Sequence, residues 1–265
     1  MTTPSEQELE YDDAFVAGLE WVWGKGFLSP GGPEEIGAIV EGLDLTGKRV
    51  LDIGCGLGGA DVVLAKNHGA GQVVGIDIEP PLVARAKQIV ADAGLEESIE
   101  IQLVEPGPLP FDADTYDVVF SKDSIIHIPD KPTFYRDVLR ILKPGGVFVG
   151  SDWLTGRSDR GRSAAMQKWV EIADLTFDLE NLQSSKQALE AAGFVDVRLT
   201  DRHDWFVGQM AAEVDAVSGD NYERMVAQLG EAGAKQRRGS TLARMEVVEI
   251  GELRPTHFRG SKASA

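Results

Sequence analysis

The chain has 265 residues, 43% of them hydrophobic, with 43 Asp and Glu against 26 Lys and Arg, which gives a formal net charge of −17. This length and apolar content allow one substantial core, as in a single catalytic domain with an elaborated lid. A strongly negative surface repels a phosphate backbone, so no nucleic acid partner is expected. The acidity fits a salt-rich cytosol and an ordinary bacterial enzyme equally well.

Two further features narrow the class. Cys55 is the only cysteine, which excludes an intrachain disulfide and a thiolate-rich zinc site, and His68, His203 and His257 show no metal-ligand spacing. No apolar run reaches the roughly 18 residues of a membrane span, and residues 1–10 are polar and acidic. We therefore expect a cytoplasmic protein without a membrane partner or a metal site.

Residues 48–150 alternate short β-branched runs with helical stretches, a pattern typical of βαβ units in a mostly parallel, doubly wound α/β sheet. The expected strands are Arg49–Ile53, Gln72–Asp77, Ile99–Val104, Tyr116–Ser121, Gly146–Asp152 and Val195–Thr200. The expected helices between them are Gly59–His68, Pro81–Ala93 and Lys131–Leu142. The breaker sequence at 143–146 ends the last of these helices and turns the chain into a strand.

Two largely helical stretches with polar faces, 155–192 and 203–242, interrupt this alternation and are candidate lids. At the carboxyl end, 245–260 contains two short alternating runs separated by Gly251 and Glu252. This pattern predicts a final antiparallel pair of strands.

The strongest motif runs from Val50 to Gly59, where a strand enters a glycine-rich turn and then a helix. Glycines fit such a turn because its conformations crowd a Cβ and because the backbone must approach a ligand closely. Asp77 ends the next strand, 23 positions after Gly54, where a carboxylate accepts the hydroxyls of a ribose. The two features together predict a nucleoside-binding site, although a tight turn and a solvent-facing acid remain the structural alternative.

Five blocks in chain order resemble class I S-adenosylmethionine-dependent methyltransferases, over about residues 48 to 200. They are Leu51–Gly56, Ile76–Ile78, Leu109–Phe111, Tyr116–Val119 and Leu142–Gly146. The resemblance implies a seven-stranded, Rossmann-like methyltransferase sheet with helical lid insertions. It implies a lid segment at 1–32, a cofactor-binding core at 33–152, an acceptor-site lid at 153–192, and the remaining strands at 193–265 with a helical insertion at about 203–242.

The same resemblance implies that Asp52 and Gly54 lie near the methionine portion of S-adenosylmethionine and that Asp77 holds its ribose. The adenine-contacting Asp and small residue of the family are replaced by Glu105 and Pro106, which keeps an acceptor but removes a backbone N–H. The full set of expected cofactor residues is Leu28, Ser29, Asp52, Gly54, Gly56, Gly58, Asp77, Ile78, Glu105 and Lys122.

Residues 20–32 and 121–128 resemble phosphoethanolamine N-methyltransferases and, more loosely, sarcosine/dimethylglycine N-methyltransferases. In the first family a tyrosine pairs with a histidine at the places held here by Tyr11 and His127. An alkylamine with a pKa of about 10 must lose a proton before its nitrogen can attack. We expect His127 to take that proton or orient the amine, Tyr11 to close the pocket, and Asp123 to contact the cofactor or the acceptor nitrogen. A core role for Tyr11 is equally open.

All five tryptophans lie outside residues 33–150, which suggests an aromatic-lined acceptor pocket; Trp23, Trp153 and Trp169 are the candidates. The phosphate-gripping tyrosines and arginine of the phosphoethanolamine enzymes correspond, without gaps, to Trp153, Trp169, Ala173 and Leu175. A carboxylate can instead be held by Arg157, Arg160 or Arg162. A solvated basic loop is the equally weighted alternative for these arginines.

These features favour a methyltransferase acting on the nitrogen of a small polar amine in a monomer or homodimer, with a sarcosine- or dimethylglycine-like acceptor preferred. Phosphoethanolamine methylation, and S- or O-methylation of a small carboxylic acid, are the alternatives within the class. A noncatalytic nucleoside-binding regulator and a nicotinamide-dependent oxidoreductase are the alternatives outside it.

Overall fold

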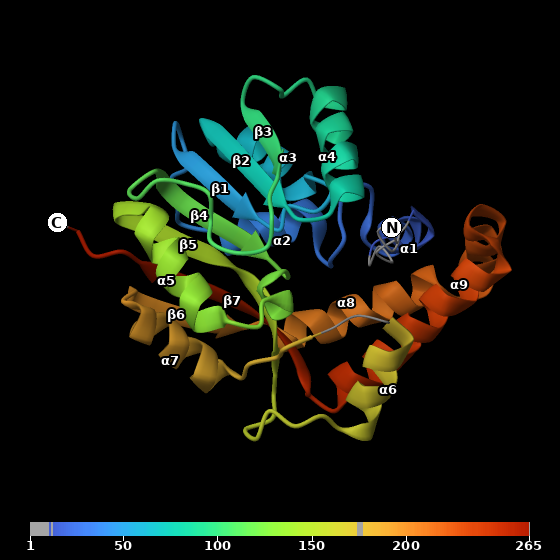
Figure 1. The fold of residues 1–265 in the computed structure, drawn as a ribbon. Helices are drawn as coiled ribbons and strands as arrows, with labels where there is room; N and C mark the ends of the chain where they lie inside the picture. The colour runs from blue at the N-terminus through green and yellow to red at the C-terminus, as the bar shows by residue number, and fades with distance from the viewer. Residues whose placement is uncertain (1–10, 12, 174–176, 265) are drawn as a thin grey trace, which may run out of the picture.

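A computed structural model describes residues 11, 13–173 and 177–264 and contains one seven-stranded sheet in the order β3-β2-β1-β4-β5-β7-β6. The described strands are β1 (Arg49–Ile53), β2 (Gln72–Asp77), β3 (Ile99–Leu103), β4 (Tyr116–Lys122), β5 (Leu142–Thr155), β6 (Val195–Asp201) and β7 (Leu253–Ser261). Neighbours from β3 to β5 pair in parallel, and β7 lies antiparallel between β5 and β6. The predicted Rossmann-like sheet is confirmed (Figure 1).

The helices flank this sheet and extend beyond it. They are α1 (Asp13–Trp23), α2 (Gly32–Ile39), α3 (Gly59–His68), α4 (Pro80–Asp92), the 3₁₀ turn η1 (Ile125–His127), α5 (Lys131–Ile141), α6 (Ala164–Ala173), α7 (Leu182–Ala192), α8 (His203–Ala216) and α9 (Gly219–Glu249). No helix within the described part of the chain is long and apolar enough to cross a membrane.

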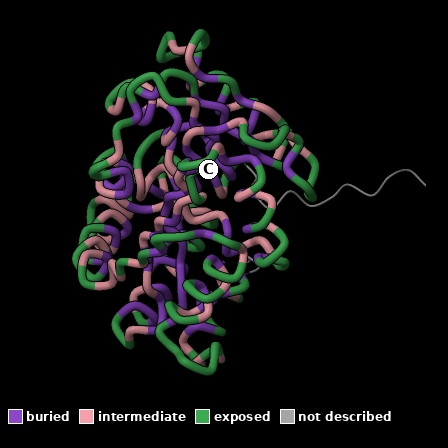
Figure 2. Tube along the Cα trace, turned by 90° about the vertical axis from the view of Figure 1, so that its left-hand side faces the viewer, coloured by how far each residue is buried: buried purple, intermediate pink, exposed green. Residues whose placement is uncertain are grey.

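The central strands bury both faces because successive side chains point to opposite sides of a sheet. Val50 packs into a core with residues of α2, α3 and α4, whereas the next residue, Leu51, packs into a second core with residues of α5 and α7. Val118 and Val119 of β4 divide in the same way. Figure 2 shows the buried segments running through the interior and the exposed ones at the periphery.

A third core holds the helical part together, with buried side chains from β5, α6, α8 and α9. Helices α1, α6 and α8 all pack against α9, and Figure 1 shows these helices on one side of the sheet. Within α9, Gly230 has a non-helical backbone (φ 75°), so the chain turns there and 231–249 forms a separate helical run. In the expected lid at 153–192, α6 joins this helical part, while α7 packs on α5 and β6.

The predicted pair of strands at 245–260 is wrong in its first half. Residues 245–249 are the last turns of α9, and only Leu253–Ser261 forms a strand. Val247 and Val248 face the third core together with Ala243, a helical spacing rather than an alternating one. A short apolar run is compatible with both the alternation of a strand and the repeat of a helix, and here packing against α6 and α8 favours the helix.

Candidate active site

A glycine-rich turn connects β1 to α3 and has a backbone that requires glycine. Gly54, Gly56 and Gly58 have φ values of 74°, 56° and 79°, a region that disfavours any residue with a Cβ. A Cβ on Gly54 would lie 2.2 Å from Oγ of Ser124. A Cβ on Gly56 would touch Leu28, 3.0 Å away. Neighbouring side chains therefore pack directly against the backbone at these two positions, and only glycine fits there.

Asp77 holds this turn from the end of β2. Its carboxylate accepts the Gly56 N–H at 2.9 Å with one oxygen and the Glu79 N–H at 3.0 Å with the other. Burial raises the pKa of Asp77, and these N–H donors and His127 act against that rise. The carboxylate is thus fixed at the carboxyl end of a parallel strand, where such sheets bind nucleosides.

Apolar side chains stand exposed at the same edge of the sheet. Ile78 after β2 is 51% exposed and Leu103 at the end of β3 is 50% exposed, and Glu105 nearby is also exposed. Two large apolar side chains beside a fixed carboxylate suit a ligand that combines a flat base with a ribose. The glycine turn, Asp77 and this platform together fit the nucleoside part of S-adenosylmethionine.

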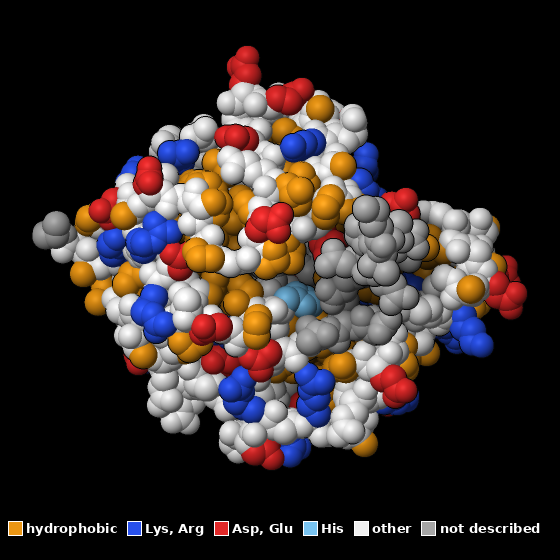
Figure 3. Space-filling view, in the orientation of Figure 1, with side chains coloured by type: hydrophobic (Ala, Val, Ile, Leu, Met, Phe, Trp, Pro, Cys, Tyr) orange, Lys and Arg blue, Asp and Glu red, His pale blue; other side chains and the backbone are white. Residues whose placement is uncertain are grey.

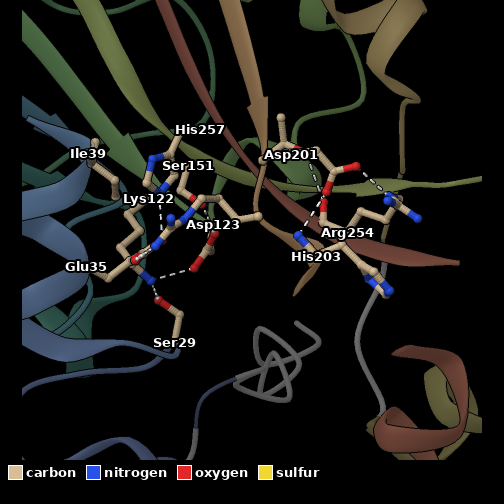
Figure 4. A network of polar contacts seen from close by, with 12 residues as sticks. Ser29, Glu35, Ile39, Lys122, Asp123, Ser151, Asp201, His203, Arg254 and His257 are labelled. Atoms are coloured by element: carbon tan, nitrogen blue, oxygen red, sulfur yellow. Dashed lines mark hydrogen bonds and ion pairs between the residues drawn. The ribbon is translucent and has the colours of Figure 1, made fainter. Parts of the chain in front are cut away.

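A polar network links the N-terminal segment to the end of β4 (Figure 4). The Lys122 ammonium donates to Ser29 Oγ at 2.5 Å and to the Asp123 carboxylate at 2.6 Å. Asp123, with φ 56°, also accepts from Ser151 Oγ at 3.1 Å. Asp123 is therefore a buried, fully engaged carboxylate at the carboxyl edge of the sheet.

Next to this network lies a pocket enclosing about 50 Å³ between the sheet edge and the helical part. It is lined by Tyr11, Phe15, Leu19, Trp23, Leu28, Ser29, Asp123, Ile126, His127, Trp153, Trp169, Ala173, Phe177, Arg237, Ser240 and Arg244. Figure 3 shows hydrophobic side chains gathered over the centre of one face, with charged ones around them.

The pocket brings together most of the predicted acceptor-site residues. Tyr11, Asp123 and His127 line it with three of the five tryptophans, Trp23, Trp153 and Trp169. Ring centroids of Trp153 and Trp169 are 5.6 Å apart, and the Trp169 ring stacks on Phe177 at 5.2 Å. Phe177 also lies 5.5 Å from the His127 ring. The aromatic character of the pocket was thus predicted from the sequence, whereas the phenylalanines that complete it were not.

Other predicted residues lie elsewhere. Arg157 is exposed and pairs with Asp159 at 3.0 Å, outside the lining of this pocket. Trp21 donates to the Ala216 carbonyl at 2.8 Å, and Trp205 lies under the Arg202 guanidinium. Residues 1–10 and 12 of the expected N-terminal lid, and Leu175, fall outside the described residues.

Helix α9 contributes residues to the pocket that were not predicted from the sequence. Arg237, Ser240 and Arg244 are spaced by three and four positions, so they share one helical face, and all three line the pocket. This spacing was the available signal. It does not reveal which part of the protein the helix face contacts, because that depends on tertiary packing. No cluster of His, Cys, Asp and Glu within the described residues could hold a metal ion.

Comparison with known proteins agrees with this geometry. Residues 44–191 match the family model described as a methyltransferase domain. Phosphoethanolamine N-methyltransferase 3 of Arabidopsis thaliana is 35% identical over 81% of this chain and 43% of its own length. Phosphoethanolamine N-methyltransferase of Triticum aestivum is 32% identical over 96% and 49%. The chain thus spans less than half the length of these relatives.

Solved structures share the fold. Phosphoethanolamine N-methyltransferase 2 of Haemonchus contortus, solved with phosphomonomethylethanolamine and S-adenosylhomocysteine, matches with a TM-score of 0.88 at 24% identity, over 97% of this chain and 59% of that one. A candidate sarcosine dimethylglycine methyltransferase from Galdieria sulphuraria matches with a TM-score of 0.74 at 20% identity, over 88% and 85%. The chain belongs to the methyltransferase-domain family.

Proposed function

We propose that this enzyme methylates the nitrogen of a small amine of the phosphoethanolamine class. The observation that carries the proposal is the placement of Tyr11, Asp123 and His127 around one pocket beside the glycine-rich turn. The plant relatives named for phosphoethanolamine methylation support this acceptor. They do not support the sarcosine- or dimethylglycine-like preference expected from the sequence, so phosphoethanolamine becomes the first candidate.

S-Adenosylmethionine supplies an electrophilic methyl group when bound. When it is bound, Asp77 would accept the ribose hydroxyls, and Ile78 would cover the adenine with Glu105 at its edge. The turn at Gly54, Gly56 and Gly58 lets the backbone approach the ligand. Leu28, Ser29 and Lys122 would line the methionine end, with Asp52 buried beneath the turn, and Lys122 joins Ser29 to Asp123.

The acceptor amine is protonated near neutral pH and needs its lone pair for the reaction. His127 takes the proton from the ammonium group or orients the nitrogen. Tyr11 closes the pocket so that water is excluded and the reactants stay in contact. Asp123, whose charge is paired with Lys122, lies on the pocket wall and offers its carboxylate oxygens as acceptors to the ammonium group.

The test is S-adenosylhomocysteine formation with phosphoethanolamine, its monomethyl and dimethyl forms, ethanolamine, sarcosine and dimethylglycine, and a methylthio acid as a sulfur acceptor. We expect turnover on the phosphorylated amines, and a loss of about 100-fold or more in kcat with His127→Ala. His68→Ala, outside the pocket, is the matched control. Turnover confined to the carboxylate amines or the sulfur acid overturns the proposed acceptor, and a fully active His127→Ala enzyme overturns the role proposed for His127.

A further inference from the structure

Arg237 is a buried cation that faces the acceptor pocket from α9. The residue is 3% exposed and lines the pocket together with Ser240 and Arg244. Its Nε and Nη1 atoms are inaccessible to solvent and have no hydrogen-bond partner among the described residues. Buried guanidinium donors are normally paired, because water no longer satisfies them. The unpaired donors indicate that a ligand completes their hydrogen bonding.

The neighbouring Arg244 differs because its charge is already balanced. Arg244 Nη2 donates to one oxygen of Glu213, a carboxylate that is 5% exposed. The other oxygen of Glu213 accepts from Trp23 Nε1 at 2.9 Å. Both oxygens of this carboxylate are therefore engaged, and it makes no hydrogen bond to Arg237. Glu213 is thus the carboxylate that acts on both guanidinium groups, whereas Asp123 in the pocket lining is paired with Lys122.

The pKa of Arg237 reflects the excess of positive charge around it. Burial and the positive charge of Arg244 lower the pKa of Arg237 to about 9, against the opposing effect of Glu213. The Trp23 ring lies beside both guanidinium groups, 5.9 Å from Arg237 and 4.9 Å from Arg244. Aromatic faces and a nearby cation do not neutralise Arg237, whereas an anion in the pocket does.

Three more unsatisfied donors line the same pocket. Trp153 Nε1, Trp169 Nε1 and Ser240 Oγ are buried, and none has a hydrogen-bond partner in the described residues. An indole N–H can only donate, so the two tryptophans need an acceptor atom from a ligand. Phosphate and carboxylate groups offer several such atoms. This second observation points to the same ligand chemistry as the unpaired guanidinium.

We propose that Arg237 recognises the anionic group of the methyl acceptor, so that the pocket selects zwitterionic amines. The inference rests on the proposed function and adds the residue that selects acceptors with an anionic group. The ammonium end lies toward Asp123 and His127, and the anionic end lies against α9. The anion is a phosphate or a carboxylate, and the position of Arg237 on α9 explains how the pocket binds it without Arg157 or the tyrosines of the phosphoethanolamine enzymes.

The test compares Arg237→Gln and Arg237→Lys with wild type, using Arg238→Gln as the control because Arg238 is the exposed neighbour on the same helix. Steady-state kinetics are measured with phosphoethanolamine, dimethylglycine and ethanolamine. We expect Arg237→Gln to raise KM for the preferred anionic acceptor about 10- to 100-fold, with kcat changed much less. Arg237→Lys should recover part of this loss, and kcat/KM for ethanolamine should stay within about 2-fold of wild type.

Ligand-dependent melting provides a readout that does not need turnover. Inorganic phosphate should raise the Tm of wild type and Arg238→Gln but not of Arg237→Gln, while S-adenosylhomocysteine should raise the Tm of all three. Wild type that binds phosphate through Arg237 but methylates no amine would overturn the proposed function and leave the anion site standing. An unchanged acceptor KM together with an unchanged phosphate shift in Arg237→Gln would overturn the inference, and so would an equal loss with ethanolamine.

Discussion

Asp61 of α3 and Asp52 of β1 are neighbouring carboxyl groups beneath the glycine-rich turn, 0% and 1% exposed, and the charge of Asp61 raises the pKa of Asp52. Oδ1 of Asp52 and both carboxyl oxygens of Asp61 have no donor among the described residues. Two ionised carboxylates cannot share such a site, so one proton joins them. A Cβ on Gly75 would lie 2.6 Å from Asp61, which explains why glycine stands opposite in β2.

The shared proton makes a prediction about stability and pH. Burial raises the pKa of Asp61 to about 7, and burial with the charges of Asp61 and Asp77 raises that of Asp52. Because the pKa values of these carboxyl groups are higher in the folded protein, the same groups ionise at a lower pH in the unfolded chain. The protonated pair therefore contributes its full share to the free energy of unfolding below about pH 4, and this contribution is lost as the pH rises toward 7.

Asp61→Asn tests this prediction, because an amide donates to Asp52 without titrating itself. We expect the free energy of unfolding of wild type, relative to Asp61→Asn, to fall by about 2 kcal/mol between pH 4.5 and 7.5. Urea denaturation of both proteins across this range measures the difference. A parallel pH dependence in the two proteins would contradict the shared proton.

Much of the cofactor half of the molecule was predictable because its signals are local. The turn at Gly54–Gly58 must follow a strand and precede a helix, and Asp77 must end the next strand, so spacing along the chain fixes their places. Asp61 escaped notice because its role depends on facing Asp52 across a helix and a strand. No spacing rule distinguishes it from an ordinary helix residue.

The acceptor half was predictable only in part. His127 and Asp123 lie close to the end of β4, so the resemblance of one short block located them. Arg237 comes from a helix more than a hundred positions later, and its burial depends on how α9 packs against α1 and α6. The same tertiary packing turned Val247 and Val248 into helix rather than strand.

Glu35 is a buried carboxylate that joins the N-terminal helices to the far end of the sheet. It accepts from Arg202 at 2.8 Å and contacts His257 Nε2 at 2.6 Å. Burial alone raises its pKa, but the hydrogen bonds and charges of His257 and Arg202 outweigh burial and lower it. Glu35→Gln should therefore cost about 2 kcal/mol at pH 7.

The sign of the pH effect is opposite to that of Asp61. A lowered pKa adds stability above the unfolded value of about 4.5, and that stability is lost as the pH falls further. The gap between wild type and Glu35→Gln should narrow below pH 4.5 in denaturation experiments. Glu34→Gln, at an exposed neighbouring position, should match wild type throughout; equal losses in both variants would exclude the pairing as the cause.

Lys122 neutralises Asp123 at the site. Replacing Lys122 by Met leaves the Asp123 carboxylate buried with Ser151 Oγ as its remaining side-chain donor in the described structure. We expect Lys122→Met to lose about 3 kcal/mol of stability and to bind S-adenosylhomocysteine more weakly. Ser29→Ala removes one hydrogen bond from the same ammonium and should cost about 1 kcal/mol. Chemical denaturation and calorimetric titration measure both, and similar losses in the two variants would contradict an essential ion pair.

Alanine substitutions at Gly54 and Gly42 distinguish two reasons for a glycine at the cofactor site, namely the left-handed backbone conformation and the lack of space for a Cβ. Their φ values are nearly equal, 74° and 75°, so a Cβ strains both backbones alike. A Cβ on Gly54 meets Ser124 at 2.2 Å, whereas nothing lies within 4 Å of one on Gly42. Gly42→Ala should cost about 1 kcal/mol and leave cofactor binding intact.

Gly54→Ala should cost more, because the turn or Ser124 must move to admit the methyl group. We expect it to weaken S-adenosylhomocysteine binding about 10-fold or more, as measured by calorimetric titration, since the displaced turn also carries the Gly56 N–H that Asp77 holds. The double variant Gly54→Ala/Ser124→Gly removes the atoms in the way and should recover most of the affinity. Failure of that rescue would mean that left-handed strain, rather than contact with Ser124, fixes glycine at this position.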